Sequence, residues 1–338
     1  MRKFVVAIII LLAVVFVFTR LTEVQSIGQT LQQGDWHYLL LAFIVEIFWL
    51  FNVAVSYWSI YRTVGLNEKI DTLLLASSGA YFLNVIAPTA GMSGMAVFLS
   101  TARRRGYSTG RTAVANFLYL FFDYIGFILV LIVGLFVLYR RDTLTNSELI
   151  GAGVLMSLAI VFSALLITGM RSKDKLANIF ASIIRKVNRL LGILHRQQQS
   201  EEKARDFAFE ISDGLQHVRK RPDGLVFPAL LAINSKFVLI LILLLIFKAF
   251  SVPLSIGTLI ASFSIGYLFL IISPTPAGLG MVEGALTLAL SSMYIPLGVA
   301  AVVALAYRAF TFWVPLAIGG VSLRILERIK IPVIENSN

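Results

Sequence analysis

The sequence Ser273-Pro274-Thr275-Pro276-Ala277-Gly278-Leu279-Gly280-Met281-Val282-Glu283 interrupts an apolar stretch that is long enough to cross a membrane. Apolar runs lie on both sides of it, at residues 254–272 and 284–293. Two prolines and two glycines within the seven residues 274–280 cannot continue a helix, because proline lacks a backbone donor and clashes with the preceding turn. In hydrocarbon, such backbone is tolerated only where protein or a water-filled cavity satisfies its polar groups. The stretch therefore predicts a cavity at membrane depth, where a glutamate is costly.

The composition is that of a membrane protein. Of the 338 residues, 58% are hydrophobic and only 14% are charged, and the mean hydropathy is +0.85; soluble domains carry about 25% charged residues. The chain has no cysteine, which excludes disulfides, thiolate metal sites and cysteine nucleophiles. The formal net charge of +11 is concentrated in loops and at the ends of apolar segments, as the positive-inside rule requires. Nucleic acid is therefore not an expected partner.

The apolar segments predict an all-α polytopic membrane protein with six full spans. These are residues 4–18, 36–60, 113–138, 149–170, 225–250 and 297–323. The first is expected to be a retained span and not a signal peptide, because no small-x-small cleavage site follows it. Two further segments, 71–101 and 254–293, are broken and are expected to be re-entrant helical hairpins or pairs of short spans.

The chain is expected to form one membrane domain over residues 1–338. Its first half covers about 1–140, a span and a basic cytoplasmic segment cover 141–224, and its second half covers about 225–330. The basic flanks of the segments predict the plasma membrane, with both termini in the cytoplasm. Within the basic segment, apolar residues recur at helical spacing between Leu176 and Leu194. This pattern predicts either a helix that lies on an anionic leaflet or a solvated linker helix.

The two broken segments resemble each other. Residues 88–95 read PTAGMSGM and residues 274–281 read PTPAGLGM, so both have Pro-Thr followed by a Gly-x-(x)-Gly-Met pattern. The charges of their flanking loops predict that the first opens from the cytoplasm and the second from the outside. That arrangement is an inverted repeat, in which transporters place their substrate near the midplane at discontinuous helices.

Four charges lie deep in the long spans, at similar distances from the two breaks. The acidic Glu46 and Asp123 are in the first half, and the basic Lys236 and Arg308 are in the second. Because charges within spans are costly unless they are paired or face a wet cavity, we predict that Asp123 pairs with Arg308 and Glu46 with Lys236. The alternative is that each charge is satisfied separately, or that Lys236 snorkels to the interface.

The broken segments predict an anion site. Half-helices that start near Gly91 and Gly280 would present free backbone N–H groups, and glycine lets a phosphate approach closely. With Arg308 nearby, such a site suits a phospholipid headgroup or another phosphorylated amphiphile. The alternative is that these small residues only let helices pack closely. Glu283 is expected either to cap the first turn of its half-helix or to carry a proton in coupling or gating.

Enzyme motifs are not found in the sequence. The three histidines, His37, His195 and His217, are scattered, and there is neither a Gly-x-Ser-x-Gly elbow nor a phosphate-binding loop. We therefore expect no enzyme activity, no metal and no cofactor.

The residues around the second break resemble a known family. PTPAGLGMVE at 274–283, followed by YRAFTFWVP at 307–315 and by Gly319, resembles the flippase-like membrane domain of the lysylphosphatidylglycerol synthase family. Asn84, with Pro88 and Gly91, is similar to the family's first-half signature. Many members carry a Gly-Glu and an Arg after the first break, where this chain has Met-Ser-Gly at 92–94, and Ala277 replaces a more usual glycine.

This resemblance covers nearly the whole chain and implies transbilayer movement of lipids, with aminoacylated phosphatidylglycerol as the best-known substrate. Full-length synthases also carry a soluble aminoacyl-transferase domain, for which residues 1–338 leave no room, so lipid aminoacylation is not expected. The resulting candidates for substrate binding or translocation are Asn84, Pro88, Gly91, Asp123, Pro274, Pro276, Gly278, Gly280, Glu283, Tyr307, Arg308 and Trp313, with Glu46 and Lys236 as further intramembrane charges.

The sequence therefore predicts a protein that handles membrane phospholipids, by flippase-like translocation of an anionic or aminoacylated phospholipid or a similar amphiphile. Two alternatives remain open at this point. One is a membrane accessory module that transports nothing and serves a lipid-modifying or glycosyl-transferring enzyme. The other is an ion-coupled transporter of small anions.

Overall fold

The computed structural model describes residues 27–86, 92–193, 200–253 and 255–329, and all regular structure in these ranges is helical. Five helical stretches are long and apolar enough to cross a membrane. They are α3 (Trp36–Thr63), α6 (Thr109–Arg140), α7 (Asn146–Arg171), Pro222–Ala249 and Leu297–Arg328. They agree with five of the six predicted spans, and the span predicted at residues 4–18 lies outside the described residues. The multi-pass helical fold is confirmed.

Two of the long stretches contain a short segment of different helix type. Pro222–Ala249 comprises the 3-10 turn η1 (Pro222–Leu225) and α10 (Val226–Ala249). Leu297–Arg328 comprises α13 (Leu297–Arg308), the π-helical turn η3 (Ala309–Trp313) and α14 (Val314–Arg328). π-helical turns are rare and occur frequently at functional sites, and η3 follows directly after Arg308.

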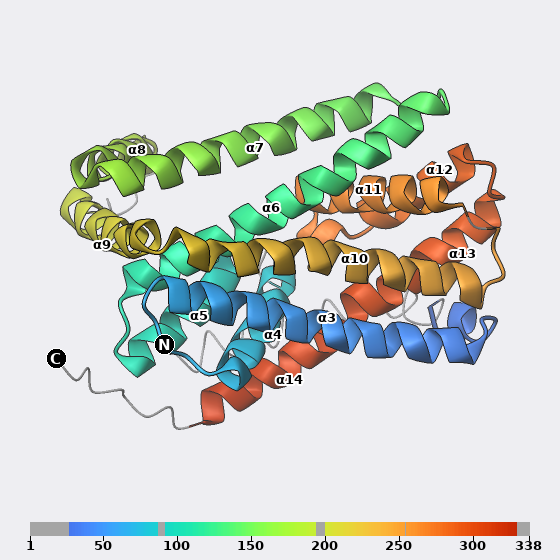
Figure 1. Ribbon diagram of the computed structural model, residues 1–338, viewed down its shortest axis with the longest axis horizontal. Helices are drawn as coiled ribbons and strands as arrows, with labels where there is room; N and C mark the ends of the chain where they lie inside the picture. Colours follow the sequence, from blue (N-terminus) through green and yellow to red (C-terminus); the bar gives the residue numbers. More distant parts are fainter. Residues whose placement is uncertain (1–26, 87–91, 194–199, 254, 330–338) are drawn as a thin grey trace.

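The helices α3 and α10 lie side by side through the middle of the molecule (Figure 1). Polar side chains join them at two adjacent levels. The indole of Trp49 donates to the hydroxyl of Ser235 over 2.8 Å, and the amide of Asn234 donates to the side-chain oxygen of Asn52 over 2.9 Å. Without a hydrophobic driving force in lipid, such bonds and close packing hold helices together.

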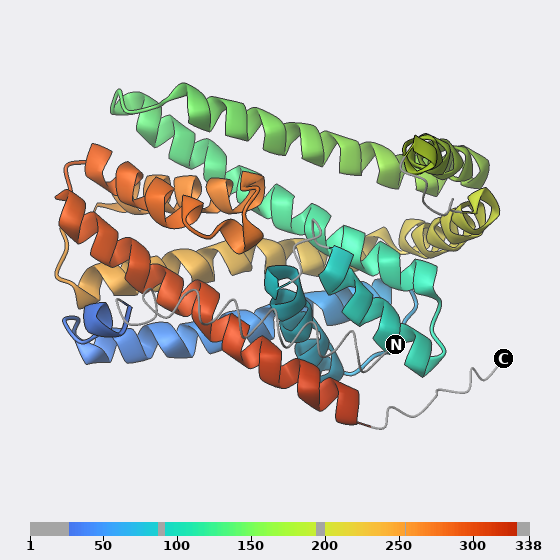
Figure 2. The ribbon, with the colours of Figure 1, turned by 180° about the vertical axis from the view of Figure 1, so that it is seen from behind.

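Two helical hairpins lie toward opposite ends of the molecule (Figure 2). The first consists of α4 (Ile70–Ile86) and α5 (Met92–Arg105), and the second of α11 (Ile256–Ile272) and α12 (Met281–Ser292). The outer ends of the first hairpin are joined by a buried ion pair of 2.9 Å between Arg105 and Glu68. The chain therefore enters and leaves this hairpin at the same end of the molecule.

Each hairpin packs against a long helix of the other half. The helix α4 packs along α14, and α11 packs along α6. The contact between α4 and α14 is close, because a Cβ atom added to Gly319 would lie 2.3 Å from the carbonyl oxygen of Ser78. Gly319 therefore sets the distance between these two helices.

The helices α8 (Lys173–Ile193) and α9 (Glu201–Lys220) pack on each other at the end of the molecule where the first hairpin opens (Figure 1). Leu176, Ala177 and Ala181 of α8 are buried, whereas Ile183 and Val187 are exposed. The helix α9 thus covers part of the predicted apolar face and leaves another part open.

The start of α6 is held by α9. The carboxylate of Glu210 accepts from the backbone N–H of Gly110 over 2.8 Å, and Arg111 forms an ion pair of 2.9 Å with Asp213. An acidic group at a helix N-terminus accepts hydrogen bonds from free amides, and its negative charge is stabilised by the positive end of the helix dipole. The segment between the two halves is therefore fastened to the first half.

Candidate functional site

The predicted break at residues 273–283 is confirmed. The helix α11 ends at Ile272, a 3-10 turn η2 follows at Pro276–Gly278, and α12 begins at Met281 with Gly280 as its N-cap. Gly278 and Gly280 have φ angles of +72° and +78°, which glycine adopts at little cost. Pro274 and Gly280 are exposed and Gly278 is buried, so the break has one open side.

Arg308 of α13 binds this break at two points. Its Nε donates to Oε1 of Glu283 over 2.7 Å, and a terminal nitrogen donates to the carbonyl oxygen of Ala277 over 2.9 Å. The guanidinium also lies 4.5 Å from the centre of the Phe312 ring, within range of a cation–π contact. Only 2% of Arg308 is exposed. The arginine therefore fastens the non-helical segment to the neighbouring long helix.

Glu283 is paired and does not cap its own turn. No side-chain cap bond forms at the start of α12, and Oε2 of Glu283 has no hydrogen-bond partner among the described residues. The first of its two predicted roles is therefore not seen, and Arg308 is its partner.

The first break is bridged by Asn84. Its side-chain oxygen accepts from the backbone N–H of Gly94 over 2.7 Å and from the hydroxyl of Ser93 over 3.1 Å. Asn84 therefore links the end of α4 to the start of α5. The candidates Pro88 and Gly91 lie outside the described residues.

The end of α4 lies against the second break. Val85 of α4, Leu279 of the break, and Phe312 and Leu316 beyond Arg308 form one buried cluster. Tyr81 of α4 donates to the carbonyl oxygen of Thr311 over 3.2 Å. Trp313 packs on the same cluster, together with Phe82 and Ala277. The structure therefore brings the two halves together at this point.

Another buried ion pair joins α6 to α10. The Nζ of Lys236 lies 2.5 Å from Asp123 and 2.6 Å from the hydroxyl of Tyr267, and that hydroxyl donates to the other oxygen of Asp123 over 2.9 Å. Lys236 is 0% exposed, so it does not snorkel to the interface.

Both predicted ion pairs are wrong. Asp123 pairs with Lys236 instead of Arg308, and Arg308 pairs with Glu283. The sequence places these charges at similar positions in the two halves, but the partner of each depends on which helices are neighbours. Lys236 does reach across from the second half to the first, although to another acid than predicted.

In the part of the chain that the structure describes, Glu46 has no hydrogen-bond partner. This residue of α3 is 0% exposed, and neither carboxyl oxygen has a hydrogen-bond partner among the described residues. It lies within electrostatic range of Tyr81 and Tyr307, and Arg308 acts on the same two tyrosines. Tyr307 is itself buried in the main core.

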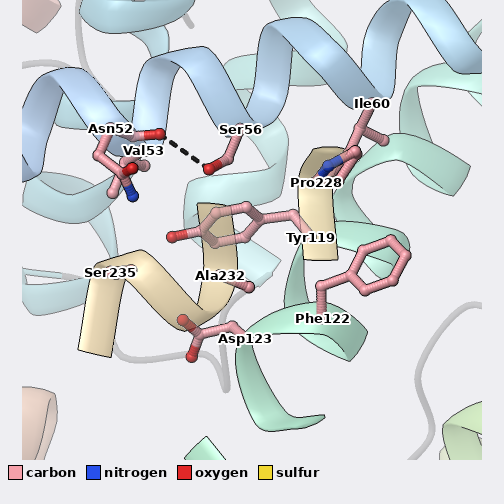
Figure 3. Close-up of a pocket in the computed structure, with 10 residues that line it drawn as sticks. All are labelled: Asn52, Val53, Ser56, Ile60, Tyr119, Phe122, Asp123, Pro228, Ala232 and Ser235. Carbon is pink, nitrogen blue, oxygen red and sulfur yellow. Dashed lines mark hydrogen bonds between the residues drawn. The ribbon is translucent and has the colours of Figure 1, made fainter. Parts of the chain in front are cut away.

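A small cavity lies beside Asp123 (Figure 3). Its volume is about 10 Å³, and residues of α3, α6 and α10 face one another across it. A space of this size holds about one water molecule. The polar residues that line it are Asn52, Ser56, Tyr119, Asp123 and Ser235. A water molecule there would have several polar partners.

Sequence analysis missed Tyr267, Asn52, Ser235 and Tyr119 as members of the polar interior. Each lies within an apolar segment, and polar residues in such segments are often only helix–helix contacts. Nothing in the sequence around these residues distinguishes them, because their role depends on their position around Asp123 and Lys236 in the folded protein. Within the described ranges, no group of three or more His, Asp or Glu side chains is placed to hold a metal ion.

Two comparisons with known proteins bear on the family of this chain. A search of curated proteins found no match. The family profile described as the lysylphosphatidylglycerol synthase TM region matches residues 4–319, nearly the whole chain. The matched range includes both hairpins, Asn84, η3 and the buried ion pairs formed by Lys236 and Arg308. The chain therefore belongs to the family of lysylphosphatidylglycerol synthase transmembrane regions.

Proposed function

We propose that this protein moves an anionic or aminoacylated phospholipid, or a similar amphiphile, across the plasma membrane. The observation that carries the proposal is the position of the two hairpins. They open toward opposite ends of the molecule, and the end of α4 meets the second break beside Arg308. An accessory module that only holds an enzyme has no need of two such opposed hairpins.

The contacts between helices support an inverted repeat with re-entrant hairpins. If α3, α4, α5 and α6 correspond to α10, α11, α12 and α13–α14, then the packing of α4 on α14 has its counterpart in the packing of α11 on α6. The central pair of α3 and α10 then lies on the pseudo-two-fold axis. Transporters of this architecture bind substrate where the repeats meet. As part of this proposal, the basic flanks of the segments favour a cytoplasmic location for both termini.

The chemistry of the second break suits a phosphate group. The first turn of α12 has backbone N–H groups without helical partners, and an anion is favoured there. Arginine binds phosphate through two parallel hydrogen bonds. In the described conformation Glu283 and the Ala277 carbonyl occupy the guanidinium. A phospholipid headgroup would therefore compete with Glu283 for Arg308.

The test is exposure of fluorescent phospholipid in reconstituted vesicles, comparing the wild type with Arg308→Ala and Glu283→Gln. Arg324→Ala, which removes an exposed arginine of α14, is the matched control. We expect wild type and control to expose lipid faster than empty vesicles, and Arg308→Ala to lose most of this rate. A wild-type rate equal to that of empty vesicles overturns the proposal and favours an accessory role. Gradient-driven uptake of a small anion without lipid movement favours the transporter alternative.

A further inference from the structure

We propose that Glu46 is a proton-binding site and that it alternates with Glu283 as the partner of Arg308. The starting observation is that Glu46 is fully buried and that neither of its oxygens has a partner among the described residues. By contrast, Asp123 and Glu283 each have a cation as partner. An ionised carboxylate with no partner is costly in such a place. The described conformation therefore holds Glu46 with its proton.

The arrangement of the two halves indicates which cation Glu46 would take when ionised. In one half of the proposed repeat, Lys236 of α10 binds Asp123 of α6. Exchanging the halves replaces α10 by α3 and α6 by α13, so the counterpart of this pair is Glu46 with Arg308. The fold thus provides two equivalent pairs of positions. The Lys236–Asp123 pair is formed, whereas in the Glu46–Arg308 pair the arginine binds Glu283 instead.

The charged and titratable groups near Glu46 come from several helices. Tyr81 of α4 and Tyr307 of α13 lie within electrostatic range of Glu46, and Arg308 of α13 lies within electrostatic range of the same two tyrosines. Glu283 of α12, which binds Arg308, also lies within electrostatic range of Tyr81. On α10, Lys236 is already held by Asp123 of α6 and Tyr267 of α11. Of the two buried cations of α10 and α13 that the structure describes, Arg308 is therefore the one we assign to the exchange.

The exchange conserves charge. When Glu46 releases its proton, the carboxylate attracts Arg308, which leaves Oε1 of Glu283 and the carbonyl of Ala277. Glu283 would then be a carboxylate in the interior without a cation, so it takes up the proton. One proton moves from Glu46 to Glu283 while the guanidinium moves the other way. The second break loses both of its bonds to α13 and becomes free to accept a headgroup.

The proton site is tested without any transport measurement. Infrared difference spectra of the full-length protein in lipid nanodiscs report the carbonyl stretch of protonated carboxyl groups during a pH titration. We expect a band at neutral pH that disappears in Glu46→Gln and persists in Glu202→Gln, which removes an exposed carboxyl of α9. Identical bands in wild type and Glu46→Gln overturn the site. Glu46→Met removes the same carboxyl and replaces Glu46→Gln if that variant does not fold.

The exchange has its own spectroscopic test. In Glu283→Gln, Arg308 loses its carboxylate partner and is expected to pair with ionised Glu46, so the Glu46 band should be lost at neutral pH. An unchanged band in Glu283→Gln overturns the exchange while leaving the proton site in place.

The coupling to lipid movement rests on the proposed function. In vesicles with an imposed pH gradient, we expect the wild-type rate of lipid exposure to change by about fivefold or more, as is typical of coupled sites. Glu46→Gln is expected to lose this response. A wild-type rate of lipid exposure that is the same with and without the pH gradient overturns the coupling. If the wild type exposes no lipid, the proposed function fails, and the infrared result still decides whether Glu46 binds a proton.

Discussion

Ala277 has a backbone conformation that alanine adopts only at a cost. Its φ of +48° lies in the left-handed region, where the Cβ atom of an L-residue costs about 1–2 kcal/mol. Its carbonyl oxygen accepts the bond from Arg308, so the strained residue is also the one that fastens the break. Glycine at this position would remove the strain, because it has no Cβ atom.

We therefore predict that Ala277→Gly raises the thermal midpoint, corresponding to about 0.5–1 kcal/mol of stability. Ala285→Gly, within the regular part of α12, is the matched control and is expected to lower stability by about 1 kcal/mol. Both are measured by thermal unfolding of the purified protein in detergent. Equal losses in the two variants would contradict the strain at Ala277.

The helices α4 and α14 approach each other so closely that only glycine fits between them. A Cβ at Gly319 would lie 2.3 Å from the Ser78 carbonyl, a distance that forces the backbones apart. We predict that Gly319→Ala destabilises the protein by about 1–3 kcal/mol, as overpacking does. Gly298→Ala in the first turn of α13 is the control, because nothing lies within 4 Å of the added atom. Thermal unfolding in detergent compares the two, and equal midpoints would contradict this prediction.

The attachment of α9 to α6 depends on pH. Burial alone would raise the pKa of Asp213, but the hydrogen bond and charge of Arg111, with His217 and Lys173 nearby, hold the pKa below its ordinary value of 3.8. A group whose pKa is lowered by folding stabilises the fold above its unfolded pKa. That contribution is lost as the pH falls through the lower, folded value.

We therefore predict that backbone amides of α9 exchange hydrogen faster below about pH 4 than at pH 6, once the intrinsic pH dependence of exchange is subtracted. Asp213→Asn should show weaker protection at both pH values and a smaller difference between them. Asp206→Asn, an exposed residue of the same helix, is the control and should behave as the wild type. A pH response in Asp213→Asn as large as that of the wild type would assign the effect to other groups.

In the whole molecule, Lys236 and Asp123 join the second half to the first through a buried ion pair. Removing one partner leaves an uncompensated buried charge and costs about 3–5 kcal/mol. We predict that Asp123→Asn and Lys236→Met each lower the yield and thermal midpoint strongly. The double variant Asp123→Asn/Lys236→Met should recover much of the loss. A double variant no more stable than either single variant would contradict the pairing.

Much of the fold could be predicted from the sequence, because the cost of placing polar backbone in lipid fixes which segments are helical spans. The break at residues 273–283 was predictable for the same reason, since proline and glycine cannot continue α11. The partners of the buried charges could not be predicted. The sequence does not determine which acid lies beside Lys236 and which lies beside Arg308. That choice, between Asp123, Glu46 and Glu283, depends on how α6, α10 and α12 pack.

The π-helical turn η3 affects the directions in which residues before and after it face, so the number of residues in the last long helix matters as well as their identity. A π turn holds one residue more than an α turn, so deleting one residue from Ala309–Trp313 would restore a regular α-helix. Each residue of an α-helix turns the chain by about 100°. The deletion would therefore leave Gly319 facing Ser78, whereas a regular α-helix of unchanged length would rotate Gly319 by about 100° away from Ser78 while Arg308 stayed at the break. By absorbing one residue, the wider turn η3 keeps Arg308 and Gly319 directed at their two different partners.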